Sequence, residues 1–304
     1  MSSRPIVSVL MAAYNSEQFI ADAIQSVLLQ SYTDFELIIV NDCSTDNTLE
    51  ICNRFADLDN RIFVYTNKTN LGDYANRNIA ASYANGKYLK FLDHDDSIYK
   101  YSLSMMVDYM ESNPSAAYGF SYRKVQNDLK PFPILYSPQE AYEEHFLKGG
   151  YFYAGPGSSI IKRESFFKVG GFSGNRFVGD FELWLKLSSK FDCIVFQSGL
   201  IWWRIHNRQE SRMADTLYFE SHLLSKYLLS LDLLSNINCP LYKSQIVKSK
   251  MIQKSLFCRH LLILLLFKLK PIRFHDLYKH SNIKYYDFIK ALFPLRLRLK
   301  KNAQ

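Results

Sequence analysis

The chain has 304 residues, of which 48% are hydrophobic and 22% charged, an ordinary composition for a globular protein with a sizeable core. Its five scattered cysteines lack CxxC spacing, which argues against a zinc site or a disulfide framework and favours a reducing cytoplasm. No signal-peptide pattern precedes the first strand-like segment, and the longest purely apolar run, 261–267, is too short to span a bilayer. We therefore expect a cytoplasmic protein.

The first hundred residues alternate between predicted strands and helices. Strands are expected at 6–13, 35–40, 62–65 and 88–92, and helices at 16–30, 48–55 and 79–83. This rhythm is typical of parallel βαβ units, hence of an α/β sheet with helices on both faces. Ligands of such sheets bind at the carboxyl ends of the strands.

The second half is less regular. Strands are predicted at 117–125, 160–161, 193–196 and 200–204, with a helix at 103–110 and an amphipathic helix at 179–187. Residues 128–150 contain three prolines and are predicted to be irregular, as a mobile loop over the site. From about residue 215 the pattern becomes helical and then basic.

The strand at 88–92 ends in Asp93, His94, Asp95 and Asp96. Three carboxylates at one strand end repel each other at neutral pH, so we expect a positive partner there, namely a divalent cation carrying a nucleotide diphosphate. The alternative is an acidic turn or helix cap. The polar turns at 14–15, 41–42 and 93–96 all follow strand ends and should form one site.

Six short motifs occur in a consistent order over about two thirds of the chain: residues 7–15, 39–46, 76–78, 91–96, 179–184 and 203–206. Together they make the region from Pro5 to about Ser211 resemble a family 2 glycosyltransferase of the bacterial surface-polysaccharide type. The resemblance implies an α/β, GT-A fold, which is a Rossmann-like mixed central sheet with helices on both faces. It also implies a domain at 1–214, with a nucleotide-sugar half at about 1–100 and an acceptor half at about 101–214, followed by a mainly helical, basic C-terminal extension at 215–304.

The resemblance also assigns the donor site. Ala13, Tyr14 and Asn15 would frame the nucleoside, and Asp42 would accept a hydrogen bond from the base. The alternative for Asp42 is a cap of the following helix. Arg77, expected at a helix start, would reach the diphosphate, or would be an ordinary surface arginine. The implied donor is a nucleotide sugar, with a UDP-sugar favoured.

The motif Asp93–His94–Asp95 occupies the family's DXD position, which holds Mg²⁺ or Mn²⁺ between the donor and the protein. Carboxylate oxygens suit these ions. By resemblance Asp95 ligates the metal, Asp93 lies nearer the ribose, and His94 is a contact or a bystander. His206 would complete the metal site, or would be structural.

Asp180 is the expected general base, which deprotonates the acceptor hydroxyl of an inverting transfer. The family usually has Glu-Asp here, but this chain has Gly179 in place of the Glu. This departure puts a second acidic contact to the acceptor in doubt. Glu182 should face elsewhere on the helix. The alternative for Asp180 is a helix cap.

From Lys243 onward the chain has many lysines and arginines but only two acids, Asp276 and Asp287. Amphipathic helices at 256–267 and 283–299 would lie on an anionic membrane surface, or would form a packed extension with a solvated basic face. No nucleic-acid-binding motif is present, so we expect no nucleic acid partner.

The sequence thus predicts an inverting, metal-dependent glycosyltransferase that uses a saccharide or lipid-linked acceptor, cytoplasmic and peripheral on the inner face of the cell membrane. Two alternatives stay open. One is a non-catalytic binding or scaffold protein on the same fold. The other is a nucleotide-sugar oxidoreductase or nucleotidyltransferase, which the absence of a Gly-rich phosphate loop after the first strand disfavours.

Overall fold

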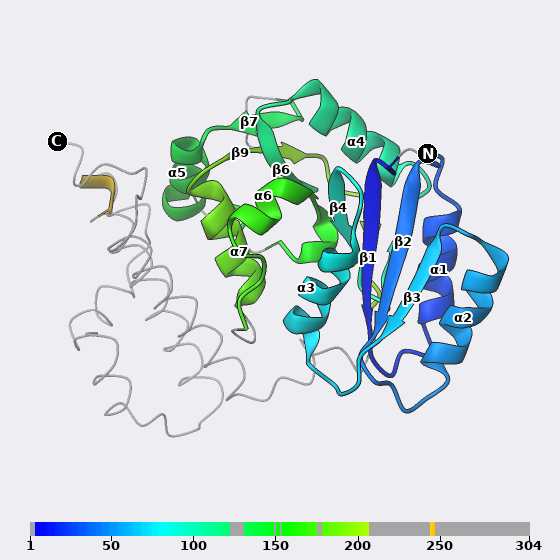
Figure 1. The fold of residues 1–304 in the computed structure, drawn as a ribbon. Helices are drawn as coiled ribbons and strands as arrows, with labels where there is room; N and C mark the ends of the chain where they lie inside the picture. Colours follow the sequence, from blue (N-terminus) through cyan, green and yellow to red (C-terminus); the bar gives the residue numbers. More distant parts are fainter. Residues whose placement is uncertain are drawn as a thin grey trace, which may run out of the picture. The chain divides into compact units, whose positions relative to one another are not determined.

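The computed structural model describes residues 4–121, 131–148, 150–152, 154–174, 178–206 and 244–246. The chain divides into two compact units, one made of Met1–Ala141 and Tyr151–His206 and the other of Tyr142–Gly150 and Asn207–Gln304. The first unit contains the sheet drawn in Figure 1. Of the predicted C-terminal extension only 244–246, a single helical turn, is described, so its helices and the boundary near 214 stay predictions.

An eight-stranded mixed sheet organises the first unit. Its strands are β1 (Val7–Ala13), β2 (Phe35–Asn41), β3 (Ile62–Thr66), β4 (Tyr88–Phe91), β6 (Ala116–Ser121), β7 (Ile134–Tyr136), β8 (Ser159–Lys162) and β9 (Asp192–Phe196), in the order β3-β2-β1-β4-β8-β6-β9-β7. Strands β1 to β4 are mutually parallel, as the βαβ rhythm predicts. Strand β8 is antiparallel to both of its neighbours, which makes the sheet mixed.

Helices cover both faces of this sheet (Figure 1). Helices α1 (Ile20–Leu28), α2 (Thr48–Leu58) and α4 (Ser102–Ser112) lie on one face, and α3 (Asp73–Tyr83), α6 (Arg163–Lys168) and α7 (Gly179–Ser188) on the other. Alternate residues of β1, such as Val9 and Met11, join one core cluster with Ile24 and Met106 on the first face. Each such fully buried side chain contributes roughly 1.5–3 kcal/mol of hydrophobic free energy.

A separate two-stranded sheet brings the end of the first unit to the tip of β4. Strand β5 (Ser97–Ile98) follows the acidic turn directly, and it pairs antiparallel with β10 (Ile201–Trp202). The residues after β10 are therefore held against the residues before β5. This pairing explains how side chains more than a hundred positions apart in the sequence meet.

The prediction that 128–150 is irregular is wrong for the part that is described. Strand β7 lies there, and it is followed by helix α5 (Pro138–Lys148). The helix starts with a reciprocal capping box, because the Ser137 N–H donates to the Glu140 carboxylate at 2.9 Å and the Glu140 N–H donates to the Ser137 hydroxyl at 3.4 Å. Pro138 occupies the first helical position, where its missing N–H costs nothing.

Several other predicted boundaries shift. Helix α3 begins at Asp73 rather than 79, α1 begins at Ile20 rather than 16, and the strand predicted at 200–204 shortens to β10. The strand predicted at 117–125 is described only as β6, since 122–130 lie outside the described residues. Helix α7 is buried around nearly its whole circumference, not amphipathic, because it fills the space between β6 and neighbouring loops with Trp184 stacked on Tyr118 and edge-on to Phe120.

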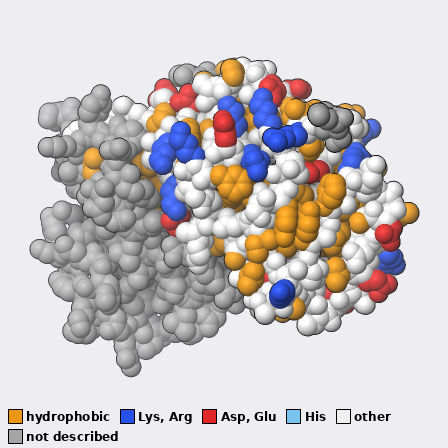
Figure 2. Space-filling model, in the orientation of Figure 1, with side chains coloured by type: hydrophobic (Ala, Val, Ile, Leu, Met, Phe, Trp, Pro, Cys, Tyr) orange, Lys and Arg blue, Asp and Glu red, His pale blue; other side chains and the backbone are white. Residues whose placement is uncertain are grey.

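Positive charge also gathers at the amino ends of β1 and β4. On the face of the molecule drawn in Figure 2, lysine and arginine side chains cluster in one region, beside a band of hydrophobic side chains. Arg4, Lys87, Lys162 and Arg163 line a hollow of about 430 Å³ there, together with neighbouring residues that include one acid. Lys87 pairs with Glu111 at 2.6 Å, and Lys162 donates to a backbone carbonyl at 2.6 Å, so these two charges already have partners.

Within the part of the chain that the structure describes, no helix is both long and apolar enough to cross a membrane.

Candidate functional site

The polar turns after β1, β2 and β4 meet at one edge of the sheet, as predicted. The Asp42 N–H donates to the carbonyl of Ala13 at 2.8 Å, and the Thr45 N–H donates to the side-chain oxygen of Asn15 at 2.8 Å. Asn15 has a φ of 47°, in the left-handed region that asparagine tolerates in tight turns. Tyr14 is 45% exposed beside this turn. The turns that follow β1 and β2 are therefore hydrogen-bonded to each other, and the side chain of Tyr14 is exposed to solvent beside them.

The Asp42 carboxylate is buried and accepts several hydrogen bonds from the loop that leads into α3. Donors are the Asn67 side-chain amide at 2.7 Å, the Leu71 N–H at 2.9 Å and the Gly72 N–H at 2.8 Å. The alternative that Asp42 caps α2 is wrong, because Asp46 accepts the Thr48 N–H at 3.0 Å. Asp42 thus fixes the start of α3, and its contact with a base stays a prediction.

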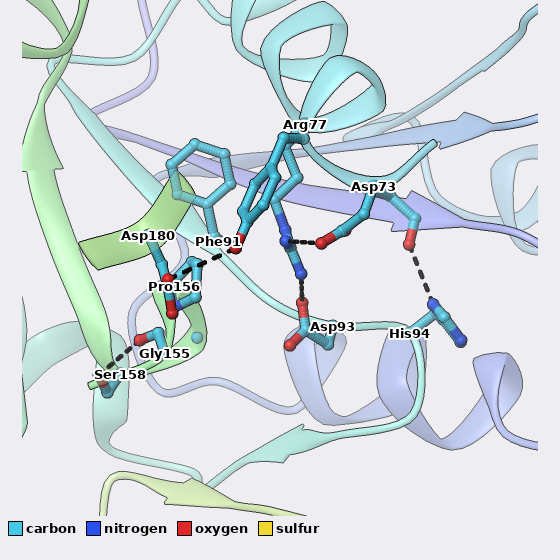
Figure 3. A network of polar contacts seen from close by, with 12 residues as sticks. Asp73, Arg77, Phe91, Asp93, His94, Gly155, Pro156, Ser158 and Asp180 are labelled. Atoms are coloured by element: carbon cyan, nitrogen blue, oxygen red, sulfur yellow. Dashed lines mark hydrogen bonds and ion pairs between the residues drawn. The ribbon is translucent and has the colours of Figure 1, made fainter. Parts of the chain in front are cut away.

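Arg77 and Asp93 form an ion pair at the centre of the site (Figure 3). The guanidinium extends from the middle of α3, not from its start as predicted, and contacts Asp73 and Asp93 at 2.5 Å each. The Arg77 side chain is 10% exposed and that of Asp93 32%, so Arg77 is not an ordinary surface arginine. Burial opposes ionisation of Asp93, but the charge and hydrogen bond of Arg77 outweigh it and hold the Asp93 pKa below its usual range.

The two predicted metal ligands lie in contact. His206 Nε2 is 2.9 Å from Asp95 Oδ2, and both side chains are less than a fifth exposed. The β5–β10 pairing brings them together, and the ring of Phe19 packs 4.6 Å from that of His206. A carboxylate oxygen beside an imidazole nitrogen is a donor set that suits Mn²⁺ or Mg²⁺ when substrate oxygens complete the coordination. No larger cluster of metal-binding side chains occurs among the described residues.

His94 and Asp96 complete the acidic turn. His94 Nδ1 lies 3.1 Å from the carbonyl of Ala12, which ties the turn to β1. Asp96 is buried, and its carboxylate accepts the Arg204 N–H at 3.0 Å. Burial, reinforced by the charges of Asp93 and Asp95, raises the Asp96 pKa to about 7. At neutral pH the carboxyl groups of Asp93, Asp95 and Asp96 therefore carry a total charge smaller than −3 in magnitude, because Asp96 is partly protonated.

Lys90 is a site residue that the sequence analysis missed. The run 88–92 reads as an apolar strand, yet Lys90 is fully buried within it. Its ammonium donates to the carbonyl of Phe91 at 2.7 Å and to the carbonyl of Gly157, in the short helix η1 (Pro156–Ser158). Burial lowers the Lys90 pKa to about 7 despite the opposing charges of Asp93 and Asp96. The sequence did contain a signal for this residue: a central strand is buried on both faces, so a lysine within it must be buried too.

Asp180 approaches this site from α7. It lies in the first turn of the helix, two residues after the flanking residue Val178, so it does not occupy the capping position. Asp180 Oδ1 accepts the Phe181 N–H at 2.7 Å and lies 3.4 Å from the hydroxyl of Tyr74 on α3. Glu182 points elsewhere, as predicted, and pairs with Lys186 at 2.7 Å. A chain of contacts thus runs from Asp93 through α3 to Asp180.

Comparisons with known sequences all point to the same protein family. Residues 8–170 match the family described as glycosyl transferase family 2. A putative teichuronic acid biosynthesis glycosyltransferase of Bacillus subtilis, TuaG, is 36% identical over 147 residues, which cover 48% of this chain and 58% of TuaG. WfgD of Escherichia coli, a UDP-Glc:alpha-D-GlcNAc-diphosphoundecaprenol beta-1,3-glucosyltransferase, is 38% identical over 124 residues, 40% of this chain and 48% of WfgD. The chain spans about half the length of these curated relatives.

Solved structures share the fold. TarS 1–349 from S. aureus, in complex with UDP, matches with a TM-score of 0.63 and 21% identity over 94% of this chain and 80% of that one. The mannosyltransferase PcManGT from Pyrobaculum calidifontis, in complex with GDP-Man and Mn²⁺, matches with a TM-score of 0.65 and 15% identity over 96% and 87%. At these identities the likeness shows the fold alone, and it confirms the predicted GT-A architecture.

The buried Lys90 predicts a specific pH dependence of stability. Its pKa is about 7 in the folded protein, and that of an unfolded lysine is about 10.4. Between these values the unfolded chain binds a proton that the folded one lacks, so the Lys90 contribution to the free energy of unfolding rises with pH. Urea unfolding of Lys90→Met at several pH values should show a shallower rise than the wild type, by up to about 1.4 kcal/mol per pH unit. Lys190→Met, which removes an exposed lysine, is the control. If the free energy of unfolding of Lys90→Met rose with pH as steeply as that of the wild type, Lys90 would not be a neutral amine in the folded protein.

Proposed function

Because the chain belongs to glycosyl transferase family 2, we propose that it moves a sugar from a nucleotide-diphosphate donor to a saccharide or lipid-linked acceptor in cell-surface polysaccharide synthesis. The observation that carries this proposal is that the family's motif residues, from six separate segments, converge on one edge of the sheet. Contacts join Asp93 to Arg77, Asp95 to His206, and Tyr74 of α3 to Asp180. Such an edge is where α/β sheets bind nucleotides.

Relatives and structural neighbours support a UDP-sugar as the first donor to test. WfgD is named as a UDP-Glc-dependent glucosyltransferase, TuaG as a teichuronic acid biosynthesis enzyme, and TarS was solved with UDP-GlcNAc. PcManGT was solved with GDP-Man and Mn²⁺, so guanosine donors belong in the same test. The acceptor named for WfgD is a sugar on a diphosphate lipid, which supports a lipid-linked acceptor here.

Each site residue has a role in this proposal. The corner of Ala13, Tyr14 and Asn15 receives the nucleoside, and the buried Asp42 accepts from the base or holds the loop that surrounds it. Arg77 contributes positive charge where the diphosphate lies and holds Asp93 toward the ribose.

Asp95 and His206 would hold Mg²⁺ or Mn²⁺, and His94 orients the turn between them and β1. The ion, when bound, supplies charge neutralisation for the departing nucleoside diphosphate. Arg77 of α3 meets the acidic turn at Asp93 and His206 meets it at Asp95, so the positive charge lies beside Asp93 and the proposed metal-binding oxygens belong to Asp95.

Asp180 acts as the base. Its carboxylate takes the proton from the acceptor hydroxyl while that oxygen attacks the anomeric carbon and the bond from this carbon to the diphosphate breaks. A direct displacement of this kind inverts the configuration at the anomeric carbon. The hydrogen bond from the Phe181 N–H favours the ionised carboxylate that this step needs.

The metal-dependent activity is tested first. Purified protein is incubated with UDP-, GDP- and dTDP-sugars and Mn²⁺ or Mg²⁺, and release of nucleoside diphosphate is measured with and without acceptor. Asp95→Ala should lose at least about 100-fold in kcat/KM, as should the wild type in EDTA, because leaving-group stabilisation is lost. Asp57→Ala, an exposed acid on α2, is the matched control. Full turnover in EDTA would refute the metal, and absence of binding to any donor would refute the transferase and favour a scaffold.

Asp180→Asn tests the base. Without a proton acceptor, kcat should fall by about 10²–10⁴-fold while donor affinity, measured by calorimetry, stays within about twofold. Glu182→Gln, which changes an acid on the same helix that pairs with Lys186, should cost stability rather than turnover. Retained transfer by Asp180→Asn would show that this carboxylate only supports the first turn of α7.

We further propose that the basic segment after Lys243 holds the protein on the inner face of the cell membrane, beside a lipid-linked acceptor. Its charge asymmetry supports this, although the segment lies outside the described residues except for 244–246. The full chain should co-sediment with vesicles that contain anionic lipid, and about 0.5 M salt or truncation at 243 should release it. Equal partitioning of the full and truncated chains would remove the membrane role.

A further inference from the structure

Tyr74 stands between the donor side and the base side of the site, and no motif identified it. It is the second residue of α3, directly after the loop that Asp42 holds and one turn before Arg77. Its hydroxyl lies 3.4 Å from Asp180 Oδ1, and the Arg77 guanidinium carbon lies 5.8 Å from the centre of its ring. One side chain therefore contacts both the base and the arginine that pairs with Asp93.

The backbone of Gly179 leaves the space that the Tyr74 ring fills. A Cβ atom at residue 179 would lie 2.8 Å from two ring carbons of Tyr74 and 3.0 Å from a third, closer than real Cβ contacts. On another side the ring stacks on Phe172 with centroids 5.2 Å apart. The glycine that departs from the Glu-Asp pattern is thus explained by packing: a side chain there and this ring position exclude each other.

The Tyr74 hydroxyl acts as a donor and not as a second base. Burial, followed by the negative charge of Asp180, raises the Tyr74 pKa well above its usual value. The phenol consequently keeps its proton throughout the physiological range. Its bond and that from the Phe181 N–H reach the same oxygen, Oδ1, which restricts rotation of the Asp180 carboxylate.

We propose that Tyr74 is the positioning residue of Asp180, and that the pair Tyr74–Gly179 takes the place of the usual acidic residue before the base. This inference rests on the proposed function, in which Asp180 removes the acceptor proton. The ring fills the space beside Gly179, and the hydroxyl sets the orientation of the Asp180 carboxylate. The neighbour of the base is then a neutral phenol whose single proton is already donated to Asp180, so its oxygen can only accept a hydrogen bond, such as one from a hydroxyl of the sugar acceptor.

Tyr74→Phe keeps the ring and removes the hydroxyl, so it tests positioning without opening a cavity. We expect kcat to fall about tenfold with an unchanged donor KM, because the bond to the carboxylate serves the base and not the donor. Loss of a donor to the ionised carboxylate raises its pKa, so the acidic limb of the kcat–pH profile should move to higher pH. Tyr83→Phe, on the same helix and stacked on Tyr65, should match the wild type.

A normal kcat and pH profile for Tyr74→Phe, in a wild type that transfers sugar and loses transfer on Asp180→Asn, would overturn the positioning role alone. Absence of transfer by the wild type would instead refute the proposed function. A double-mutant cycle of Tyr74→Phe and Asp180→Ala, which removes the accepting oxygen altogether, on urea unfolding needs no activity at all. We expect the effects to be non-additive by at least about twofold in the unfolding constant, and additive effects would overturn the contact.

The exclusion between residue 179 and the ring has its own test. Gly179→Glu should lower the urea midpoint strongly in the wild-type background, because the new side chain meets the Tyr74 ring. In Tyr74→Ala the same substitution should be tolerated better, so that the double variant is more stable than additivity predicts. Equal destabilisation in both backgrounds would refute the pairing of Tyr74 with Gly179.

Discussion

The mutual repulsion of three carboxylates at the tip of β4 is the constraint on which the site depends. Each acid is compensated in a different way. Asp93 is paired with Arg77, Asp95 contacts His206, and Asp96 is buried with a pKa raised to about 7. At neutral pH the turn therefore carries less negative charge than its composition indicates, and Asp95 is the acid left to meet a cation.

These compensations require particular tertiary elements. Helix α3 supplies Arg77, and its start is fixed by the loop bonded to Asp42. The β5–β10 pair brings His206 to Asp95 and the Arg204 N–H to Asp96. Lys90 bonds the carbonyls of Phe91 in β4 and Gly157 in η1, so one buried amine ties β4 to η1 beside the acidic turn. A change at any of these elements alters the electrostatics of the whole turn.

Where the predictions failed, the physical reasons differ. The capping box at 137–140 was readable from the sequence, but the surrounding prolines concealed it. The early start of α3 was not readable, because Gly72 adopts a φ of 84° and its N–H is bound by Asp42, thirty residues away. The burial of Lys90 was not expected for a lysine, and the two carbonyls that it contacts make this burial tolerable.

The sequence by itself determined the alternation of strands and helices, the family and the acids at the strand ends, because hydrophobic period and short motifs are local properties. It did not determine how those acids are charged, which residue stands beside Asp180, or why residue 179 is a glycine. Those features depend on burial and on contacts between α3 and α7, which are distant in the sequence. The pKa of a carboxylate and the room for a Cβ atom are set by what surrounds them, and only the tertiary structure supplies the surroundings.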